Sequence, residues 1–310
     1  MRENKNYVAK SMASPKPIKW VMIALIPGST ATIIFFGTGY LWNIAIATCI
    51  SLILEGGCLV ASRKRLSELH DGGFLITAII IGLSLPPDIA PAIVITAVGG
   101  AILIGRLLYG GERNHLFNPA MVGYVIVLIS FPETVSSWPA PVDGLTNATA
   151  LVSMKYREGL TVLEAWNVLN GHGTIGGYGW EWINLCFLIG GILLILKKMI
   201  SWQTPLSIIG TITLLSIANF DSGSMDSKGP PLFHLFAGST MLLAFFVASD
   251  PTTQPIHNRD KAILGMVIGS ITFFVRGWGN YPDGAAFAVL LGNAITPYLN
   301  SRRIKFNAKS

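Results

Sequence analysis

Ten apolar runs occupy most of this chain and constrain its fold more than any other feature of the sequence. Charged residues make up only 12% of the chain and AVILMFWYC residues 51%, a balance that a bilayer can accommodate but a soluble core cannot. We therefore predict an all-α integral membrane protein with about ten transmembrane helices, and we exclude collagen-like and disordered chains. The runs lie at about 20–36, 40–61, 74–85, 90–108, 117–131, 182–196, 204–219, 231–249, 262–275 and 284–299.

Basic residues recur in every second connection between these runs, which predicts the orientation of the chain. Because cytoplasmic connections carry an excess of Lys and Arg, we expect both tails to be cytoplasmic and the long loop 132–181 to be external. The predicted organisation is a tail at 1–19, helices at 20–131, the loop, helices at 182–299 and a tail at 300–310. The basic groups are the N-terminal tail, Arg63-Lys64-Arg65, Arg106 with Arg113, Lys197-Lys198, Arg259 with Lys261, and the C-terminal tail.

A weak internal repeat relates the two predicted sets of five helices. Leu85-Pro86-Pro87-Asp88 in the first set corresponds to Ala248-Ser249-Asp250-Pro251 in the second, at an offset of about 160–170 residues. Since five is an odd number of spans, the two repeats must have opposite orientation, with a site expected where they meet. We predict two inverted five-helix repeats, as in urea transporters.

The external loop contains a motif for covalent flavin attachment, D-x-x-[S/T]-x-A-T, which begins at Asp143. In this motif Thr146 and Ala148 precede Thr149, the threonine whose hydroxyl is joined to the flavin phosphate by a flavin transferase. Two alternatives compete, namely an N-x-T glycosylation site at Asn147 and an ordinary turn. A G-x-G-x-x-G at 171–176 lacks the strand that a dinucleotide-binding fold needs, so it predicts only flexible backbone.

Three acidic residues near or within the apolar runs are candidates for an ion path. Glu55 lies well inside the second run, and Asp88 and Asp250 lie at the two proline breaks. Ionisable groups at such depth are costly and usually functional, although interfacial or structural positions are the alternative. The histidines and the three cysteines show no ligand spacing, which predicts no metal site in this chain, and we expect the thiols to be buried and inert.

The sequence resembles the D subunit of the Rnf electron-transport complex, which is related to the B subunit of the sodium-translocating NADH:quinone oxidoreductase. The resemblance covers about residues 14–300 and rests on four sequence features. These features are the flavin motif at 143–151, Leu116-Phe117-Asn118-Pro119-Ala120, Ser249-Asp250-Pro251, and Ser14-Pro15 before the first run. The sequence departs from the family at Gly177, where the family often has a glutamate, and the nearby Glu181 is off register.

The resemblance implies a redox subunit of a bacterial inner-membrane complex, incomplete as an enzyme by itself and without a catalytic residue of its own. Covalent FMN on Thr149 would relay electrons between ferredoxin and NAD, coupled to Na⁺ or H⁺ transport. The implied partners are a second covalent-FMN subunit, iron–sulfur subunits and the flavin transferase, with membrane lipid around them and no nucleic acid. Whether riboflavin also binds between the repeats stays open. The alternative function is a urea-transporter-like channel or transporter without redox chemistry, which would have no need of the flavin motif.

Overall fold

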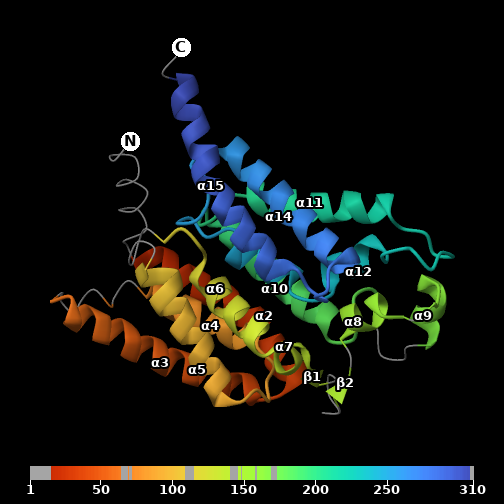
Figure 1. Ribbon diagram of the computed structural model, residues 1–310, viewed down its shortest axis with the longest axis horizontal. Coiled ribbons are helices and arrows are strands. Elements are labelled where there is room, and N and C mark those ends of the chain that lie inside the picture. Colours follow the sequence, from red (N-terminus) through yellow and green to blue (C-terminus); the bar gives the residue numbers. More distant parts are fainter. Residues whose placement is uncertain are drawn as a thin grey trace.

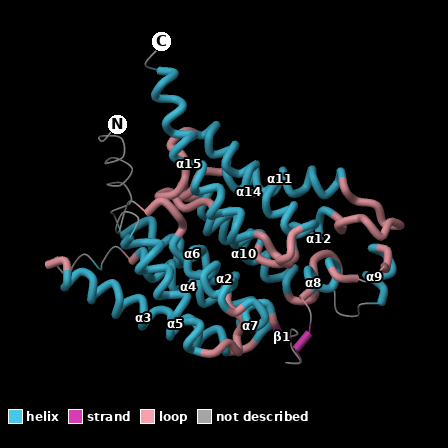
Figure 2. Tube along the Cα trace, in the orientation of Figure 1, coloured by secondary structure: helices cyan, strands magenta, loops and turns pink. Residues whose placement is uncertain are grey.

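The computed structural model is predominantly helical, and Figure 2 shows helix along most of the trace. It describes residues 15–63, 69, 72–108, 115–139, 146–147, 149–157, 159–168 and 173–307. Among these residues, four helices are long and apolar enough to cross a membrane, namely Ile18–Phe36, Gly39–Ala61, Pro91–Leu108 and Asn258–Trp278. Shorter apolar helices accompany them, as expected of a chain with broken or half-spanning segments.

The helices before the long loop form one group, in warm colours in Figure 1. Gly72, at a φ of 63°, precedes α4, and Asn118 caps α6 by accepting a hydrogen bond from the backbone N–H of Met121. Leu85 is extended before Pro86-Pro87, which ends α4 as the proline pair predicts. The group comprises α2 (Pro15–Phe36), α3 (Gly39–Ala61), α4 (Gly73–Ser84), α5 (Pro91–Gly99), the π-helix η2 (Gly100–Leu108) and α6 (Pro119–Ser130).

The predicted external loop contains short elements that lie together at one end of the molecule (Figure 1). Its two-residue strands pair antiparallel, with Trp138 opposite Asn147 and Pro139 opposite Thr146. The loop is also bonded to the helices that follow it, because Lys155 donates to the carbonyls of Val275 and Tyr281. Its elements are α7 (Pro132–Ser136), β1 (Trp138–Pro139), β2 (Thr146–Asn147), α8 (Ala150–Lys155) and α9 (Val162–Val168).

The helices after the loop form the second group and differ from the predicted runs in two places. The run 231–249 is divided into three short helices with a break at 237–239, and the last helix continues past residue 299 into the predicted tail. The group comprises α10 (Trp180–Leu196), α11 (Gln203–Ala218), α12 (Pro231–Phe236), α13 (Thr240–Leu242), the π-helix η3 (Leu243–Val247), α14 (Asn258–Trp278) and α15 (Ala285–Asn307).

The two groups meet where α2 packs against α10. The backbones approach closely because the contact uses glycine: a Cβ on Gly28 would overlap the Phe187 ring, and one on Gly190 would overlap the Ala24 carbonyl. Small residues at helix contacts are typical of membrane proteins. The expectation of buried thiols is wrong for Cys49, which is exposed on α3, while Cys58 and Cys186 are partly exposed.

Candidate functional site

Thr149 is the N-cap residue of α8, and its side chain lines a cavity between the two helix groups. Its Oγ1 accepts a hydrogen bond from the backbone N–H of Val152 at 3.3 Å. The residue is half-buried, so the hydroxyl is held at a defined place without being enclosed. Of the other motif residues, Thr146 lies in β2, whereas Asp143 and Ala148 lie outside the described residues.

Aromatic side chains from distant parts of the chain line the same cavity. Trp138 from β1 and Trp180 from α10 lie with ring centroids 5.2 Å apart, and Phe36 of α2 packs on both. Edge-to-face contacts of this kind hold large rings in fixed orientations. Tyr124 of α6 and Tyr281, which precedes α15, also line the cavity. Such walls suit a planar, partly apolar heteroaromatic group.

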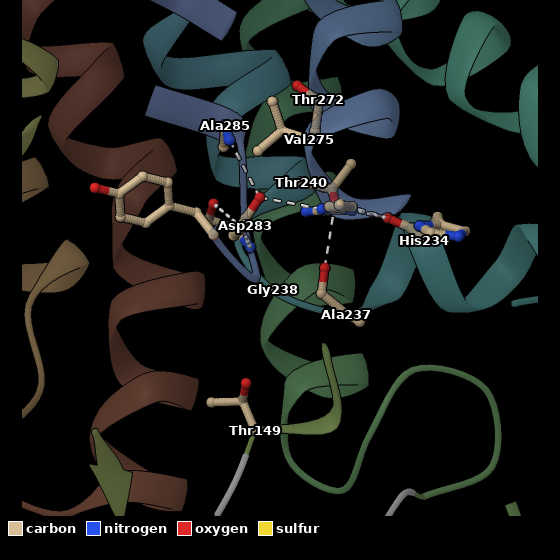
Figure 3. A network of polar contacts seen from close by, with 12 residues as sticks. Thr149, His234, Ala237, Gly238, Thr240, Thr272, Val275, Asp283 and Ala285 are labelled. Atoms are coloured by element: carbon tan, nitrogen blue, oxygen red, sulfur yellow. Dashed lines mark hydrogen bonds and ion pairs between the residues drawn. The ribbon is translucent and has the colours of Figure 1, made fainter. Parts of the chain in front are cut away.

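A polar network centred on Asp283 contributes Asp283 and Ser239 to the cavity lining (Figure 3). One carboxylate oxygen accepts hydrogen bonds from Arg276 Nε at 3.0 Å and from the Ala285 backbone. The other accepts from the Ser239 backbone and from its hydroxyl at 3.0 Å. Figure 3 shows Thr149 beside this network, with no interaction joining the two. The position of Asp283 is therefore fixed by Arg276, Ser239 and the Ala285 backbone, without any contribution from Thr149.

Arg276 also stabilises the break between α12 and α13. Its guanidinium donates to the carbonyl of His234 at 2.7 Å and to the hydroxyl of Thr240 at 3.0 Å. Burial alone would raise the pKa of Asp283, but the Arg276 guanidinium and the Ser239 donors outweigh burial and lower that pKa below its usual value. Asp283 is therefore a carboxylate at neutral pH.

Asn184 of α10 holds the same break from its other side. Its amide nitrogen donates to the carbonyls of Phe236 and Gly238, and its Oδ1 accepts from the Met241 backbone. The free backbone groups of a broken helix need such partners inside a membrane protein. Asn184 also lines the cavity, so one side chain both shapes the break and faces the site.

A second cavity lies between the helix groups and is lined by Arg106, Asn118 and Asp250. Arg106 of η2 lies 3.3 Å from the carboxylate of Glu55, and both side chains are almost fully buried, at 5% and 3% exposure. The structure thus places Glu55 inside the helix group as predicted, in an ion pair with Arg106. Arg106 is counted among the basic residues of a connection, but the structure places it inside η2, where it is buried.

Asp250 joins the two helix groups at this second cavity. His115 Nε2 lies 3.4 Å from the Asp250 carboxylate and 2.7 Å from the Thr252 hydroxyl, which itself donates to Asp250. Burial would raise the pKa of Asp250, but the bonds from His115 and Thr252 lower it below its usual value. Asp88, in contrast, is exposed in the turn after α4, apart from the other candidate acids.

Asn118, in the sequence Leu116-Phe117-Asn118-Pro119-Ala120, forms hydrogen bonds to the second helix group. Its backbone N–H donates to Asn293 of α15 at 2.9 Å, and its amide donates to the Val247 carbonyl of η3. Pro119 then begins α6, where a missing N–H costs nothing. The run thus connects α6 to two elements of the second helix group.

Glu181 brings a carboxylate to the glycine-rich turn, although Gly177 itself carries none. Its Oε2 accepts hydrogen bonds from the backbone N–H groups of Thr174, Ile175 and Gly176, at 3.0, 2.9 and 3.3 Å. A carboxylate four residues further along therefore folds back onto the turn. The turn is held by these bonds, where the sequence predicted flexible backbone.

Several residues of the two cavities escape sequence reasoning. Asn184 and Ser239 are ordinary polar residues in apolar surroundings, and only the tertiary contacts reveal them. Arg276 gives a usable signal, because it is a single charge at the end of a long apolar run. Among the described residues, no group of three or more His, Cys, Asp or Glu side chains could hold a metal ion.

Comparison with known proteins gives one family. The model of the "NQR2, RnfD, RnfE family" matches residues 2–307. A protein from Ectopseudomonas mendocina, named as the D subunit of an ion-translocating oxidoreductase complex, is 40% identical over 301 residues, covering 90% of this chain and 87% of that protein. Proteins of the same name from Pseudomonas paraeruginosa and Pectobacterium atrosepticum are 36% and 35% identical, covering 96% and 91% of this chain and 93% and 90% of their own lengths.

Proposed function

Because the chain belongs to the NQR2, RnfD, RnfE family, we propose that it carries FMN covalently on Thr149 within an ion-translocating oxidoreductase complex. The relatives named as the D subunit of such a complex match almost the whole chain, which supports a membrane subunit of that complex. The flavin and its electron relay between ferredoxin and NAD, coupled to Na⁺ or H⁺ transport, are our proposal.

The observation that carries the proposal is the position of Thr149 on an aromatic-lined cavity. A phosphoester on its Oγ1 would tether a flavin at the cavity, near Trp138 and Trp180. The Asp283 carboxylate and the Ser239 hydroxyl supply polar atoms in the same lining. The residues present therefore fit a group with a planar ring and hydrogen-bonding edges.

The chain's residues would act on such a group by holding it and by limiting its contact with water. When bound, FMN supplies a centre that takes up and passes on electrons one or two at a time. Thr149 would hold the phosphate end of this group, and the indole rings of Trp138 and Trp180 would restrict the orientation of its ring. Asp283 is held on both oxygens by Arg276 and Ser239, so it presents its charge in one fixed place. Preorganised polar groups of this kind set the electronic environment of a cofactor.

The wider assembly follows from the same proposal. We propose two inverted five-helix repeats spanning the bacterial inner membrane, with the flavin loop external and both tails cytoplasmic. The buried Glu55, paired with a residue of the second cavity, supports an ion path there. Iron–sulfur subunits, a second covalent-FMN subunit and a flavin transferase would supply the other redox centres and the attachment. Riboflavin between the repeats is a further cofactor that this arrangement could hold.

In-gel fluorescence of the denatured protein under ultraviolet light tests the attachment. Wild-type protein should give a fluorescent band, and Thr149→Ala should give none, because no hydroxyl remains for the phosphoester. Thr149→Ser retains a hydroxyl and is the matched control for the position, while Thr146→Ala is the control for the motif. Fluorescence that persists in Thr149→Ala and disappears in Thr146→Ala would contradict the assignment.

A further inference from the structure

A third cavity, which we call the basic cavity, lies beside the end of α14 and is formed by segments that are far apart in sequence. Lys155 and Arg157 come from the long loop, Lys228 from the connection between α11 and α12, and Arg276 from α14. No acidic side chain is among the described residues that line it. The lining residues are Leu151, Met154, Lys155, Arg157, Gly159, Met225, Lys228, Phe233, His234, Arg276, Gly277 and Pro282.

Two of the four cations already have acidic neighbours. Arg276 is paired with Asp283 at 3.0 Å, and Arg157 interacts electrostatically with Asp226 while donating to the carbonyls of Met154 and Leu160. These two arginines are therefore largely satisfied by the protein. The excess positive charge of the cavity rests on the two lysines.

Neither lysine is paired with an acid among the described residues. Lys155 Nζ donates to the carbonyls of Val275 at 3.0 Å and Tyr281 at 2.7 Å, so it caps the end of α14. The ammonium of Lys228 has no hydrogen-bond acceptor in that part of the chain and lies over the Trp278 ring, 5.0 Å from its centroid. Lys228 can therefore offer three N–H donors to an added group.

The two ammonium groups also lie close enough to disfavour one another. Burial lowers the pKa of Lys155, and the nearby charge of Lys228 lowers it further. An anion placed between like charges relieves both the repulsion and the lost hydration. The cavity therefore has the electrostatics of an anion site, independently of the flavin proposal.

The surroundings of the basic cavity resemble the interface of a membrane. Trp278 and Phe274 of α14 are 54% and 51% exposed, and Met225 is 63% exposed. Exposed Trp residues beside cations are typical of the level where lipid headgroups lie. His234 donates from Nε2 to the Lys228 carbonyl, which leaves Nδ1 as an acceptor without a partner among the described residues.

We propose that the basic cavity binds a phosphate group, with Lys228 and Lys155 as its charged ligands. The phosphate can belong to an anionic lipid such as phosphatidylglycerol or to free inorganic phosphate, since the chemistry recognised is the same. The cavity lies at a level where a lipid headgroup would reach it from the side of α14.

The test compares Lys228→Gln with Lys197→Gln in the full chain purified in its membrane complex. Lys197 is the matched control, because it also lies over an indole ring, that of Trp20 at 4.7 Å, but is exposed and lines none of the three cavities described. Inorganic phosphate is titrated at fixed ionic strength while thermal unfolding is followed. In a second arm, retained phosphatidylglycerol is measured by mass spectrometry after transfer to phosphatidylcholine nanodiscs.

Lys228→Gln should weaken phosphate or phosphatidylglycerol binding about tenfold, which corresponds to loss of one charge-assisted contact. Lys197→Gln should bind like the wild type. Stabilisation by inorganic phosphate identifies a free anion, whereas retention of phosphatidylglycerol alone identifies a lipid site. Equal binding by all three proteins in both arms would overturn the proposal. Labelling of Lys228 with an amine reagent gives a further check. If partner subunits protect Lys228 and neither phosphate nor phosphatidylglycerol does, the occupant is an acidic protein segment and the proposal is wrong.

Discussion

The two helix groups each contain a buried arginine beside a carboxylate, but the Nε atoms of the two guanidinium groups differ in their contacts. Arg276 bonds to Asp283, to the His234 carbonyl and to Thr240, and Asp283 has three further donors. Arg106 lies 3.3 Å from Glu55, and its Nε has no partner among the described residues. The Arg276 guanidinium is thus fixed to its carboxylate through Nε, whereas the Arg106 guanidinium keeps one buried donor without a partner among the described residues.

The two ion pairs also lie beside different cavities. Arg276 and Asp283 stabilise a broken helix beside the cavity of Thr149, where a cofactor would need fixed walls. Arg106 belongs to a π-helix and lines the second cavity, and π-helical segments occur frequently at functional sites. We therefore expect the first pair to be architectural, whereas the second belongs to the ion path that we propose.

Replacing Arg276 should lower the stability of the protein more than any other substitution in the two ion pairs. Arg276→Met should lower the free energy of unfolding by about 3–5 kcal/mol, because it removes one partner of a buried, hydrogen-bonded ion pair. Arg259→Met is the matched control, since Arg259 is exposed at the start of the same helix and should change stability by less than about 0.5 kcal/mol. Thermal unfolding in detergent measures both variants. Equal losses of stability in Arg276→Met and Arg259→Met would show that the buried contacts of Arg276 do not stabilise the protein.

The second prediction concerns removal of the whole Glu55–Arg106 pair. Glu55→Met alone should destabilise the protein by about 3 kcal/mol, because it leaves Arg106 buried without its carboxylate. The double replacement Glu55→Met with Arg106→Met should recover most of that loss, since replacing both charges with apolar groups is often near neutral. A double variant as unstable as the sum of its singles would show that this pair is architectural too.

The third prediction tests ion coupling at Glu55. Glu55→Gln keeps the shape and a hydrogen-bonding side chain but removes the charge, so flavin should remain on Thr149 while ion-coupled electron transfer falls. Glu55→Asp should also impair coupling, because a shorter side chain cannot reach Arg106 equally well. NADH-linked electron transfer and ion uptake in membrane vesicles provide the measurement. Wild-type values for both in the Gln variant would reject the coupling role and leave a structural carboxylate.

The smallest effect concerns pH: the charge of Asp283 should make the stability of the protein depend on acid pH. Its pKa is lowered in the folded protein, so its stabilising contribution is present above the pKa of the unfolded chain, about 4. The contribution should disappear as pH falls through the folded-state pKa. Asp283→Asn should remove this part of the pH dependence, seen as a flatter plot of unfolding temperature against pH. An unchanged slope below pH about 4 would assign the acid sensitivity to other carboxylates.

Local patterns predicted the features that depend on neighbouring residues in the chain. The apolar runs indicated the helices, the proline pair at 86–87 ended α4, and the lone acid of the second run, Glu55, is buried as expected. Flavin attachment at Thr149 stays a prediction from a short motif, because attachment chemistry needs only a hydroxyl with small neighbours. In each case the physical cause lies within a few residues.

Features that depend on distant contacts could not be predicted. Asn184 acts through carbonyls at Phe236 and Gly238, more than fifty residues away, and no periodicity records such a contact. Arg106 carries the same positive charge as a cytoplasmic topology signal, and only its packing against Glu55 distinguishes the two roles. The break at 237–239 likewise lies inside a run that reads as one apolar segment.

Flavin attachment at Thr149, beside the aromatic cavity, can be decided by peptide mass spectrometry. The wild-type protein is purified from its native membrane and then digested. We expect the peptide containing Thr149 to carry FMN with the elements of water lost, and fragmentation to assign the adduct to the Thr149 side chain. An adduct on Thr146, a glycan on Asn147, or an unmodified peptide throughout would contradict the assignment.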